Sequence, residues 1–230
     1  MTAKVTGAQS LQTIAANSAC AKVNWKNRGS ATVGYYEGLA SAFGHAYCRL
    51  QKNPDFVAAK APAGNADALA YLGIKATKGQ DALIKTFTLL AGLGMRESSG
   101  CYSAGWDSSA GPETATEAEA GAWQASYNSH VADPELDTLF EEFQKDNSHC
   151  YLADFQDGKG CKNSQSIRGT GVGATFQSLE KSCPGFAAVY AAVGVRVLRN
   201  HWGPILRREV EYKIECENMF TTLASQITCK

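Results

Sequence analysis

The chain has 230 residues, of which 44% are hydrophobic and 19% are charged, so it is long enough to form one domain with a sizeable core. Its 22 Lys and Arg residues balance 22 Asp and Glu residues, which leaves no formal net charge. This balance argues against a nucleic-acid binder, and no apolar stretch has the length of a membrane span. The aromatic content of 10% is too high for a disordered chain. We therefore expect a soluble, globular protein that is a monomer.

The eight cysteines are scattered along the chain. None of them forms the Cys-x-x-Cys pair that zinc ribbons and thioredoxin-like sites need. Scattered cysteines are typical of disulfide bonds in an oxidising compartment, although the spacing does not determine their pairing. The alternative is a cytosolic protein with several free, buried cysteines. Because residues 1–4 lack the features of a signal peptide, we expect the mature form of a secreted or periplasmic protein with an added Met.

The N-terminal residues 1–34 are small, polar and rich in Gly, Asn and Ser, and they predict an irregular arm that is tied down through Cys20. The remaining residues, 35–230, are predicted to form a single helical domain. Alternating strand patterns are nearly absent and no internal repeat is found. We therefore predict a mainly α fold that is stabilised by disulfides and contains at most a small hairpin.

Apolar residues at helical spacing predict three helices in the first half of this domain, over residues 35–50, 66–72 and 80–97. Gly100 ends the third helix. The following residues, 101–113, are rich in Ser, Gly and Pro and predict a loop. A further helix is expected to begin near Thr116.

The clearest helix start in the second half is at Asp133 and Pro134. Asp133 can cap free backbone N–H groups, and Pro134 suits the first helical position. The segment 151–173 is rich in Gly, Lys and Asn and predicts a loop. Two more helices are predicted over 184–200 and 204–227, the second being the longest in the chain.

A carboxylate stands at the end of the apolar helix that is predicted over 80–97. Glu97 is followed at once by the small residues 98–100, which predict a loop. Apolar surroundings and the negative end of a helix both make a carboxylate harder to ionise, which raises its pKa. A general acid that works near neutral pH needs this shift, because it must still hold the proton that it donates. The alternative is that Glu97 is a solvated residue or an ion-pair partner of Arg96.

Two short motifs stand close together in this region, Glu97-Ser98-Ser99-Gly100 and Gly121-Ala122-Trp123-Gln124-Ala125-Ser126-Tyr127. Together they resemble motifs of the lysozyme superfamily, and the nearest branch is that of goose-type lysozymes and soluble lytic transglycosylases. The resemblance covers about residues 80–130. It implies a lysozyme-like helical domain in which Glu97 is the catalytic acid, Ser98 is its motif neighbour, and Gly121 and Gln124 line a glycan cleft.

The chain also departs from the family pattern. Ala122-Trp123 replaces the usual Leu-Met, which changes the cleft wall, and Ser126 stands where goose-type enzymes are expected to have an Asp. The late transglycosylase motif Ala-Tyr-Asn-x-Gly is echoed around Tyr190, but its Asn is missing. Tyr190 is nevertheless included among the predicted substrate-binding residues.

The presence and position of a second carboxylate would distinguish inverting hydrolysis, retaining hydrolysis and transglycosylation. Inverting hydrolysis places it about 6.5–9.5 Å from the acid to hold a water, whereas retaining hydrolysis places it about 5–5.5 Å away as a nucleophile. Asp107 and Glu119 are the preferred candidates among the acids between the two motifs, although acids near Glu119 also suit a helix N-terminus. Without a second carboxylate, the substrate's own hydroxyl can attack, and the reaction is then a transglycosylation.

Aromatic side chains near the motifs offer flat apolar faces on which sugar rings can stack. The residues concerned are Tyr102, Trp106, Trp123 and Tyr127. An equally good interpretation places Trp123 in the core. Gln124 can pair with an N-acetyl group.

Metal and cofactor sites are not expected. The four His residues lack any ligand spacing, and the glycines at 169–173 lack the strand and helix of a dinucleotide site. The sequence therefore predicts a secreted, disulfide-bonded muramidase-like hydrolase, with peptidoglycan as its polysaccharide substrate. The alternatives are a lytic transglycosylase, a chitinase or chitosanase, a non-catalytic glycan-binding or structural protein, and an effector that acts on another protein.

Overall fold

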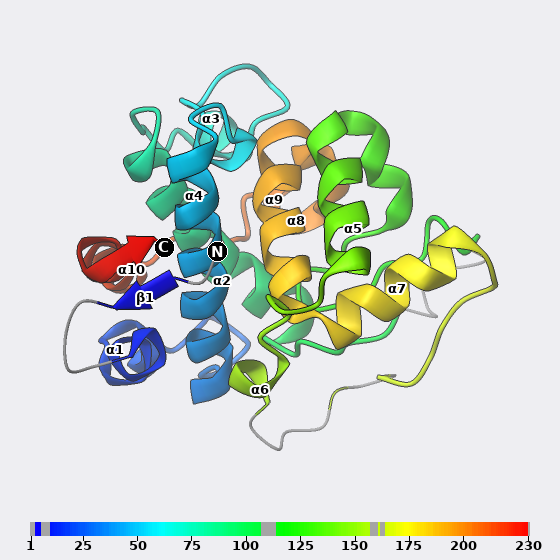
Figure 1. Cartoon of the computed structure of the whole chain (residues 1–230), viewed down its shortest axis with the longest axis horizontal. Helices are drawn as coiled ribbons and strands as arrows, with labels where there is room; N and C mark the ends of the chain where they lie inside the picture. The colour runs from blue at the N-terminus through cyan, green and yellow to red at the C-terminus, as the bar shows by residue number, and fades with distance from the viewer. Residues whose placement is uncertain (1–2, 6–9, 107–113, 157–160, 162–163, 230) are drawn as a thin grey trace.

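Three helices, α2 (Val33–Lys52), α4 (Gln80–Ser98) and α8 (Pro184–Val197), pack against one another at the centre of the fold (Figure 1). The computed structural model describes residues 3–5, 10–106, 114–156, 161 and 164–229. Helix α8 is apolar on all sides and is buried from Pro184 to Arg196, as expected for a helix enclosed by others. The mainly α fold class is thereby confirmed.

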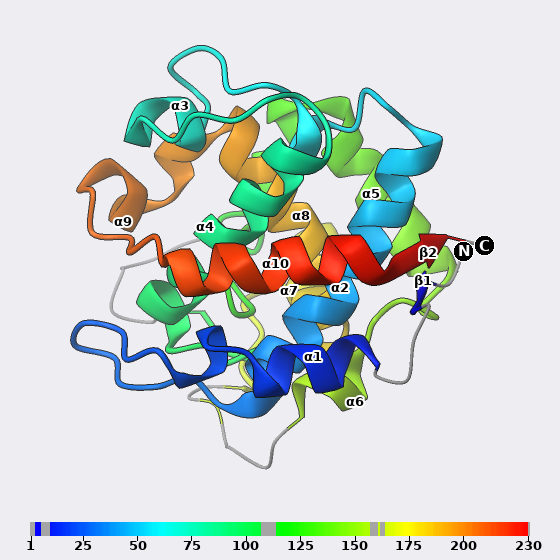
Figure 2. The same cartoon turned by 90° about the vertical axis from the view of Figure 1, so that its left-hand side faces the viewer.

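The two ends of the chain meet on one side of this core. Figure 2 shows α10 (Ile214–Gln226) lying across the core, with α1 (Leu11–Asn17) next to it. Strands β1 (Ala3–Val5) and β2 (Ile227–Cys229) pair antiparallel, with Ala3 opposite Cys229. The N-terminal segment, which was expected to be irregular, therefore contains a regular helix and a paired strand.

The opposite side is formed by α5 (Pro134–Lys145), α6 (Leu152–Phe155) and α7 (Val172–Ser182), which pack on the core (Figure 1). The predicted start of α5 is confirmed, since the Asp133 carboxylate accepts a hydrogen bond from the backbone N–H of Glu135. The remaining short elements are α3 (Ala68–Leu72), α9 (Gly203–Leu206), η1 (Cys20–Lys22), η2 (Val57–Ala59), η4 (Tyr127–Ala132) and η5 (Arg199–His201).

All eight cysteines form disulfides, which confirms the predicted disulfide stabilisation and excludes the alternative of free thiols. The pairs are Cys20–Cys216, Cys48–Cys229, Cys101–Cys161 and Cys150–Cys183. The first two bonds close long loops and hold both chain ends on the core, which limits the freedom of the unfolded chain most strongly. Within the described ranges, no helix combines the length and apolar character that crossing a bilayer requires.

Three predictions about helices were wrong. No helix begins near Thr116, because Gly121 and Gln124 take the left-handed backbone conformation and turn the chain back on itself. The helix predicted over 204–227 is interrupted, and the segment 207–213 separates α9 from α10. The segment 151–173 was predicted as a loop, but it contains α6 and the first residues of α7.

Candidate active site

Glu97 occupies the last turn of α4, where the chain leaves the core sharply. Ser99 caps the helix in the left-handed conformation (φ 59°) and donates its N–H to the carbonyls of Gly94 and Met95. Gly100 follows with a φ of 75° and donates its N–H to the carbonyl of Gly94. These two left-handed residues end the helix at Ser98, one residue after Glu97, and the Glu97 side chain is half-buried beside the turn.

Ser98 joins the two motifs that were identified in the sequence. Its hydroxyl donates to the carbonyl of Ala122 over 2.9 Å and accepts from the N–H of Cys101 over 2.9 Å. The end of α4 and the segment 119–125, which we call the motif loop, are therefore held against each other. Ser98 has a structural role here, since its hydroxyl is committed to the backbone.

The motif loop is a tight reversal. Ala120 and Ala125 form an antiparallel bridge, and Gly121 turns between them with a φ of 76°. The side-chain amide of Gln124 donates to the carbonyl of Gly121 over 2.9 Å. Gln124 is only 8% exposed, so its amide stabilises the loop instead of facing a cleft, and its predicted role in substrate binding is wrong for this conformation.

Trp123, Tyr190 and Gly121, which were also predicted to bind substrate, are buried. The Trp123 indole N–H donates to the carbonyl of Leu90 over 3.0 Å, and the Tyr190 hydroxyl lies 3.0 Å from the hydroxyl of Ser129. A polymer that arrives from solvent cannot reach these side chains. Their predicted roles are corrected to core packing and, for Gly121, to a backbone conformation that an L side chain rarely adopts.

Burial raises the pKa of Glu97 from its usual 4.5 to about 7. The guanidinium groups of Arg207, Arg28 and Arg96 oppose this effect, and the carboxylate of Glu209 adds to it. The α4 C-terminus, which carries partial negative charge, also favours the protonated form. At neutral pH, Glu97 is therefore close to its midpoint and holds a proton in about half of the molecules.

Two of the arginines near Glu97 form ion pairs with Glu209. Arg96 and Arg207 both form ion pairs with Glu209, over 2.9 Å and 3.1 Å. The Glu209 carboxylate offsets part of the positive charge of both arginines, so they attract an ionised Glu97 less strongly. Burial therefore remains the largest cause of the shift in the Glu97 pKa. Glu97 does not form the ion pair with its neighbour Arg96 that the sequence offered as an alternative.

Glu119, one of the two predicted second carboxylates, belongs to the motif loop and lies 3.7 Å from Nε2 of His201. The same nitrogen lies 3.0 Å from the carbonyl of Gln124, which can only accept, so Nε2 carries a proton. Burial lowers the pKa of His201, which favours the neutral imidazole. His201 thus links η5 to the motif loop through its bond to the Gln124 carbonyl. The other predicted carboxylate, Asp107, lies outside the described residues.

The remaining predicted aromatic residues do not form one surface. The Arg168 guanidinium lies 5.2 Å from the ring centre of Trp106, which is half-buried. Tyr127 stacks on His130, with ring centres 4.4 Å apart. Tyr102 follows the turn after Gly100 and lines a separate cavity.

Sequence reasoning missed Glu180, which lies behind the motif loop on α7. Its carboxyl is fully buried, and neither oxygen has a hydrogen-bond partner. A Cβ placed on Gly121 would lie only 2.7 Å from one of these oxygens, so the two residues are in direct contact. Burial raises the pKa of Glu180 well above its usual value, which favours the protonated carboxyl. Its position four residues after Phe176, on the same side of a helix, is the signal that could have identified it.

Among the described residues, no group of three or more His, Cys, Asp or Glu side chains is arranged to hold a metal ion. No protein-family model, curated protein or solved structure matches the chain.

Proposed function

We propose that the chain is a glycan-cleaving enzyme of lysozyme type that hydrolyses β-1,4 linkages in peptidoglycan, with Glu97 as the general acid. The observation that carries the proposal is the half-buried Glu97 carboxyl with a pKa of about 7, at the end of α4 and beside the motif loop. A carboxyl with this pKa is protonated often enough to donate a proton and acidic enough to release it at neutral pH.

The first step is the transfer of the Glu97 proton to the glycosidic oxygen. The bond from this oxygen to the anomeric carbon breaks, its electron pair stays on the oxygen, and the leaving sugar departs as an alcohol. Positive charge develops on the anomeric carbon and ring oxygen of the other sugar. The newly ionised Glu97 lies near this charge and stabilises it.

The second step needs a nucleophile. Glu119 is the described candidate for a base, because it lies in the motif loop, 3.7 Å from Nε2 of His201. In hydrolysis it would accept a proton from the attacking water. In the alternative, a lytic transglycosylase, the substrate's own hydroxyl attacks and returns its proton to Glu97, so that no water is consumed.

Four disulfides fit a protein that works outside the cytosol, where such a polymer is found. A secreted or periplasmic location and a monomeric state are part of the proposal. A chitin-like polymer is the second candidate substrate.

The experiment that tests the proposal is the digestion of purified peptidoglycan, followed by mass spectrometry of the soluble fragments. The wild type should release muropeptides, and Glu97→Gln should release none above background while it still binds the polymer. Glu117→Gln, which neutralises an exposed carboxylate near the same loop, is the matched control and should keep wild-type activity.

Reducing ends indicate hydrolysis, and anhydro ends, lighter by one water, indicate transglycosylation. Equal fragment release by wild type and Glu97→Gln would overturn the proposal. Binding without any release by the wild type would favour a non-catalytic glycan-binding protein.

A further inference from the structure

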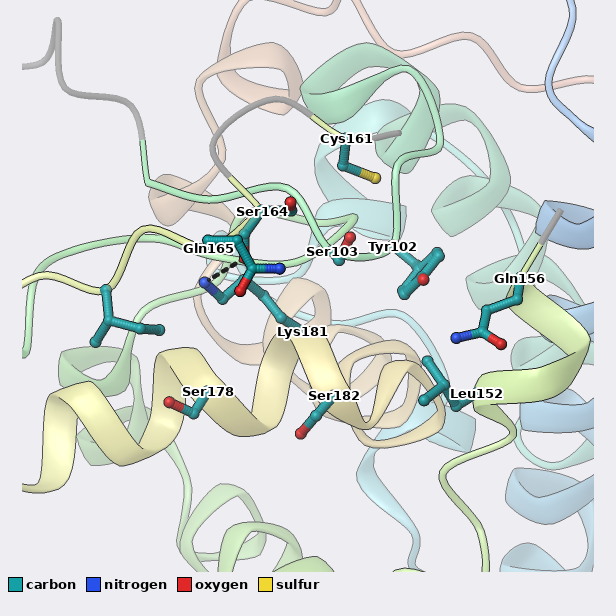
Figure 3. A pocket seen from close by; sticks show the side chains of 11 residues that line it. Tyr102, Ser103, Leu152, Gln156, Cys161, Ser164, Gln165, Ser178, Lys181 and Ser182 are labelled. Carbon is teal, nitrogen blue, oxygen red and sulfur yellow. Dashed lines mark hydrogen bonds between the residues drawn. The ribbon is translucent and has the colours of Figure 1, made fainter. Parts of the chain in front are cut away.

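A cavity of about 470 Å³ lies between α7, α6 and the turn that follows Gly100 (Figure 3). Tyr102 and Ser103 form one wall and belong to the turn that carries the chain away from Glu97. Ser178 and Lys181 of α7 line the opposite side. A second cavity, of about 610 Å³, continues along the same face of α7, since Ser178 lines both.

The lining of the first cavity combines polar and apolar side chains and contains no acid among its described residues. Its hydroxyl and amide groups belong to Ser103, Gln156, Ser164, Gln165, Ser178 and Ser182. Such groups pair with amide N–H and C=O groups and with hydroxyls. Lys181 is the cation within this lining, as Figure 3 shows.

The ammonium group of Lys181 lacks an anionic partner among the described residues. Lys181 is only 8% exposed, and its Nζ donates to the carbonyls of Ser164 and Ser166 over 2.8 Å and 2.7 Å. These two acceptors are neutral, and an ammonium group has three donors. Its neighbour Glu180 is directed to the other side of α7, against Gly121. Burial lowers the pKa of Lys181, so this charge is held at a cost that a nearby anion would relieve.

Two other cations are buried among the described residues. Arg199 is 6% exposed, bonds to the neutral oxygens of Asn65 and lies over the ring of Tyr71. Arg196 is 5% exposed, and its guanidinium forms a two-point ion pair with the carboxylate of Asp67, over 3.0 Å and 2.8 Å. The core therefore supplies a permanent counter-charge to Arg196 and an aromatic ring to Arg199. Lys181 has neither of these partners in the described structure and lines a cavity, where an anionic ligand could reach it.

We propose that this cavity binds a carboxylate of the peptide stem of peptidoglycan, with Lys181 as its cationic partner and the surrounding hydroxyl and amide groups as partners of the peptide backbone. The inference rests on the proposed function. A single ammonium without an arginine suits a singly charged carboxylate. Tyr102 connects the cavity with the turn after Glu97, so a branch from the cleaved glycan can enter it. A chitin-like polymer has no carboxylate and would leave Lys181 unpaired.

The test is isothermal titration calorimetry with four soluble probes in the Glu97→Gln background, which prevents cleavage. The probes are a muropeptide with free peptide carboxylates, the same muropeptide with these carboxylates amidated, a peptide-free muramyl oligosaccharide that keeps its lactyl carboxylate, and chitotetraose. We expect the free-carboxylate muropeptide to bind about 10- to 100-fold more tightly than its amidated form, the range for one charged hydrogen bond. Lys181→Met should remove this difference, and Lys145→Met, which removes an exposed lysine charge, should keep it.

A second pair of variants covers the case that Lys181→Met does not fold. Ser178 is exposed on α7, so Ser178→Asp adds a negative charge to the lining and Ser178→Asn adds a neutral side chain of the same shape. Both variants remove the Ser178 hydroxyl, so their difference reports the added charge: the aspartate should bind the free-carboxylate muropeptide several-fold more weakly than the asparagine. Equal binding of the two muropeptides would overturn the inference. Discrimination that survives in both Lys181→Met and Ser178→Asp would overturn it as well. Preference for the peptide-free oligosaccharide would assign the cavity to the lactyl carboxylate and contradict the peptide assignment.

This readout is independent of catalysis. If fragment release depends on Glu97 but the probes bind alike, the inference fails and the proposed function stands. If the muropeptides are discriminated through Lys181 but Glu97→Gln does not change fragment release, the proposed function fails and the binding site remains.

Discussion

Two carboxyl groups with raised pKa, Glu97 and Glu180, belong to two different helices that contact the motif loop. Glu97 ends α4, where the hydroxyl of the next residue is bonded to the loop carbonyl of Ala122. Glu180 lies in α7 with an oxygen directed at Gly121. Burial raises the pKa of both groups. Their surroundings differ, since Glu97 is half-buried among charged neighbours and Glu180 is enclosed without a partner.

The comparison shows that a raised pKa alone does not make a catalytic acid. The pKa of Glu97 lies near neutral pH because arginines offset part of the effect of burial, so its proton can leave and return. At Glu180 burial is the one cause of the raised pKa, and no neighbouring cation offsets it. Glu97 thus fits proton transfer, and Glu180 fits the filling of space behind the loop.

The largest expected effect is a difference in enzymatic activity between variants of Glu97 and variants of Glu180. Glu97→Gln should lower the rate of fragment release by about 10²- to 10⁴-fold, the usual contribution of a general acid. Glu180→Gln should keep the rate within a few-fold of the wild type. The rates are measured as soluble reducing or anhydro ends released from peptidoglycan. A comparable loss in both variants would contradict the assignment of different roles.

The contact between Gly121 and Glu180 predicts the next largest effect. Gly121→Ala combines a left-handed backbone with a Cβ 2.7 Å from the Glu180 carboxyl, and it should lower the free energy of unfolding by about 2–4 kcal/mol. Gly64→Ala is the matched control, because Gly64 has a φ of 73° with nothing within 4 Å, and it should cost about 1 kcal/mol. Urea denaturation measures both. Equal losses would show that the contact with Glu180 has no energetic consequence.

Removing the unpartnered carboxyl should stabilise the protein. Glu180→Met keeps the volume and removes the buried polar group, so the free energy of unfolding should rise by about 1–3 kcal/mol at pH 7. The gain should be smaller at pH 4. The raised pKa of folded Glu180 means that the wild type loses stability as pH rises above the usual value of 4.5. Thermal denaturation at the two pH values tests this, and a destabilised variant at pH 7 would reveal a bonded carboxyl.

The pH dependence of activity should reflect Glu97. Because the acid works only when protonated, kcat/KM should fall about tenfold between pH 6 and pH 8, with a midpoint near 7. The same raised pKa means that the contribution of Glu97 to stability is present below pH 4.5 and is lost as pH rises through about 7. Glu97→Gln should remove this loss, which denaturation at pH 4, 6 and 8 can follow. Activity that is constant from pH 6 to pH 8 would contradict the role of Glu97.

The smallest effect concerns the hydrogen bond that joins α4 to the motif loop. Ser98→Ala leaves the Ala122 carbonyl without this donor and should cost about 0.5–1.5 kcal/mol of stability. Activity should fall less than in Glu97→Gln. Ser178→Ala, in which the lost hydroxyl is exposed and bonds within its own helix, should cost less. Denaturation midpoints of the two variants decide the comparison.

Local patterns in the sequence predicted the fold well where they are strong. The stripes of α2 and α4 and the Asp133 cap of α5 are local features, and all three were confirmed. The motif loop was predicted as part of a helix from its local sequence. In the structure Gly121 turns the chain and lies against Glu180 of α7, a contact between distant residues that the local sequence does not reveal. Long-range contacts of this kind, such as the bond from His201 to Gln124, have no signature in the local sequence.

The candidate site was predicted in part. The end of an apolar helix indicated that Glu97 would be partly buried, and the structure has it half-buried with a raised pKa. The predicted cleft residues Trp123 and Gln124 are instead buried, because their polar atoms bond to Leu90 and Gly121 within the fold. Residue type alone does not distinguish an aromatic ring or amide in the core from one that faces substrate.

The most direct test of the account is a pH titration of the Glu97 carboxyl carbon by ¹³C NMR, with Glu97→Gln used to assign the signal. The account predicts a transition with a midpoint near pH 7, because the group must retain its proton until it reaches a glycosidic oxygen. A midpoint near 4.5, as in a freely solvated glutamate, would contradict the role of Glu97 as the general acid.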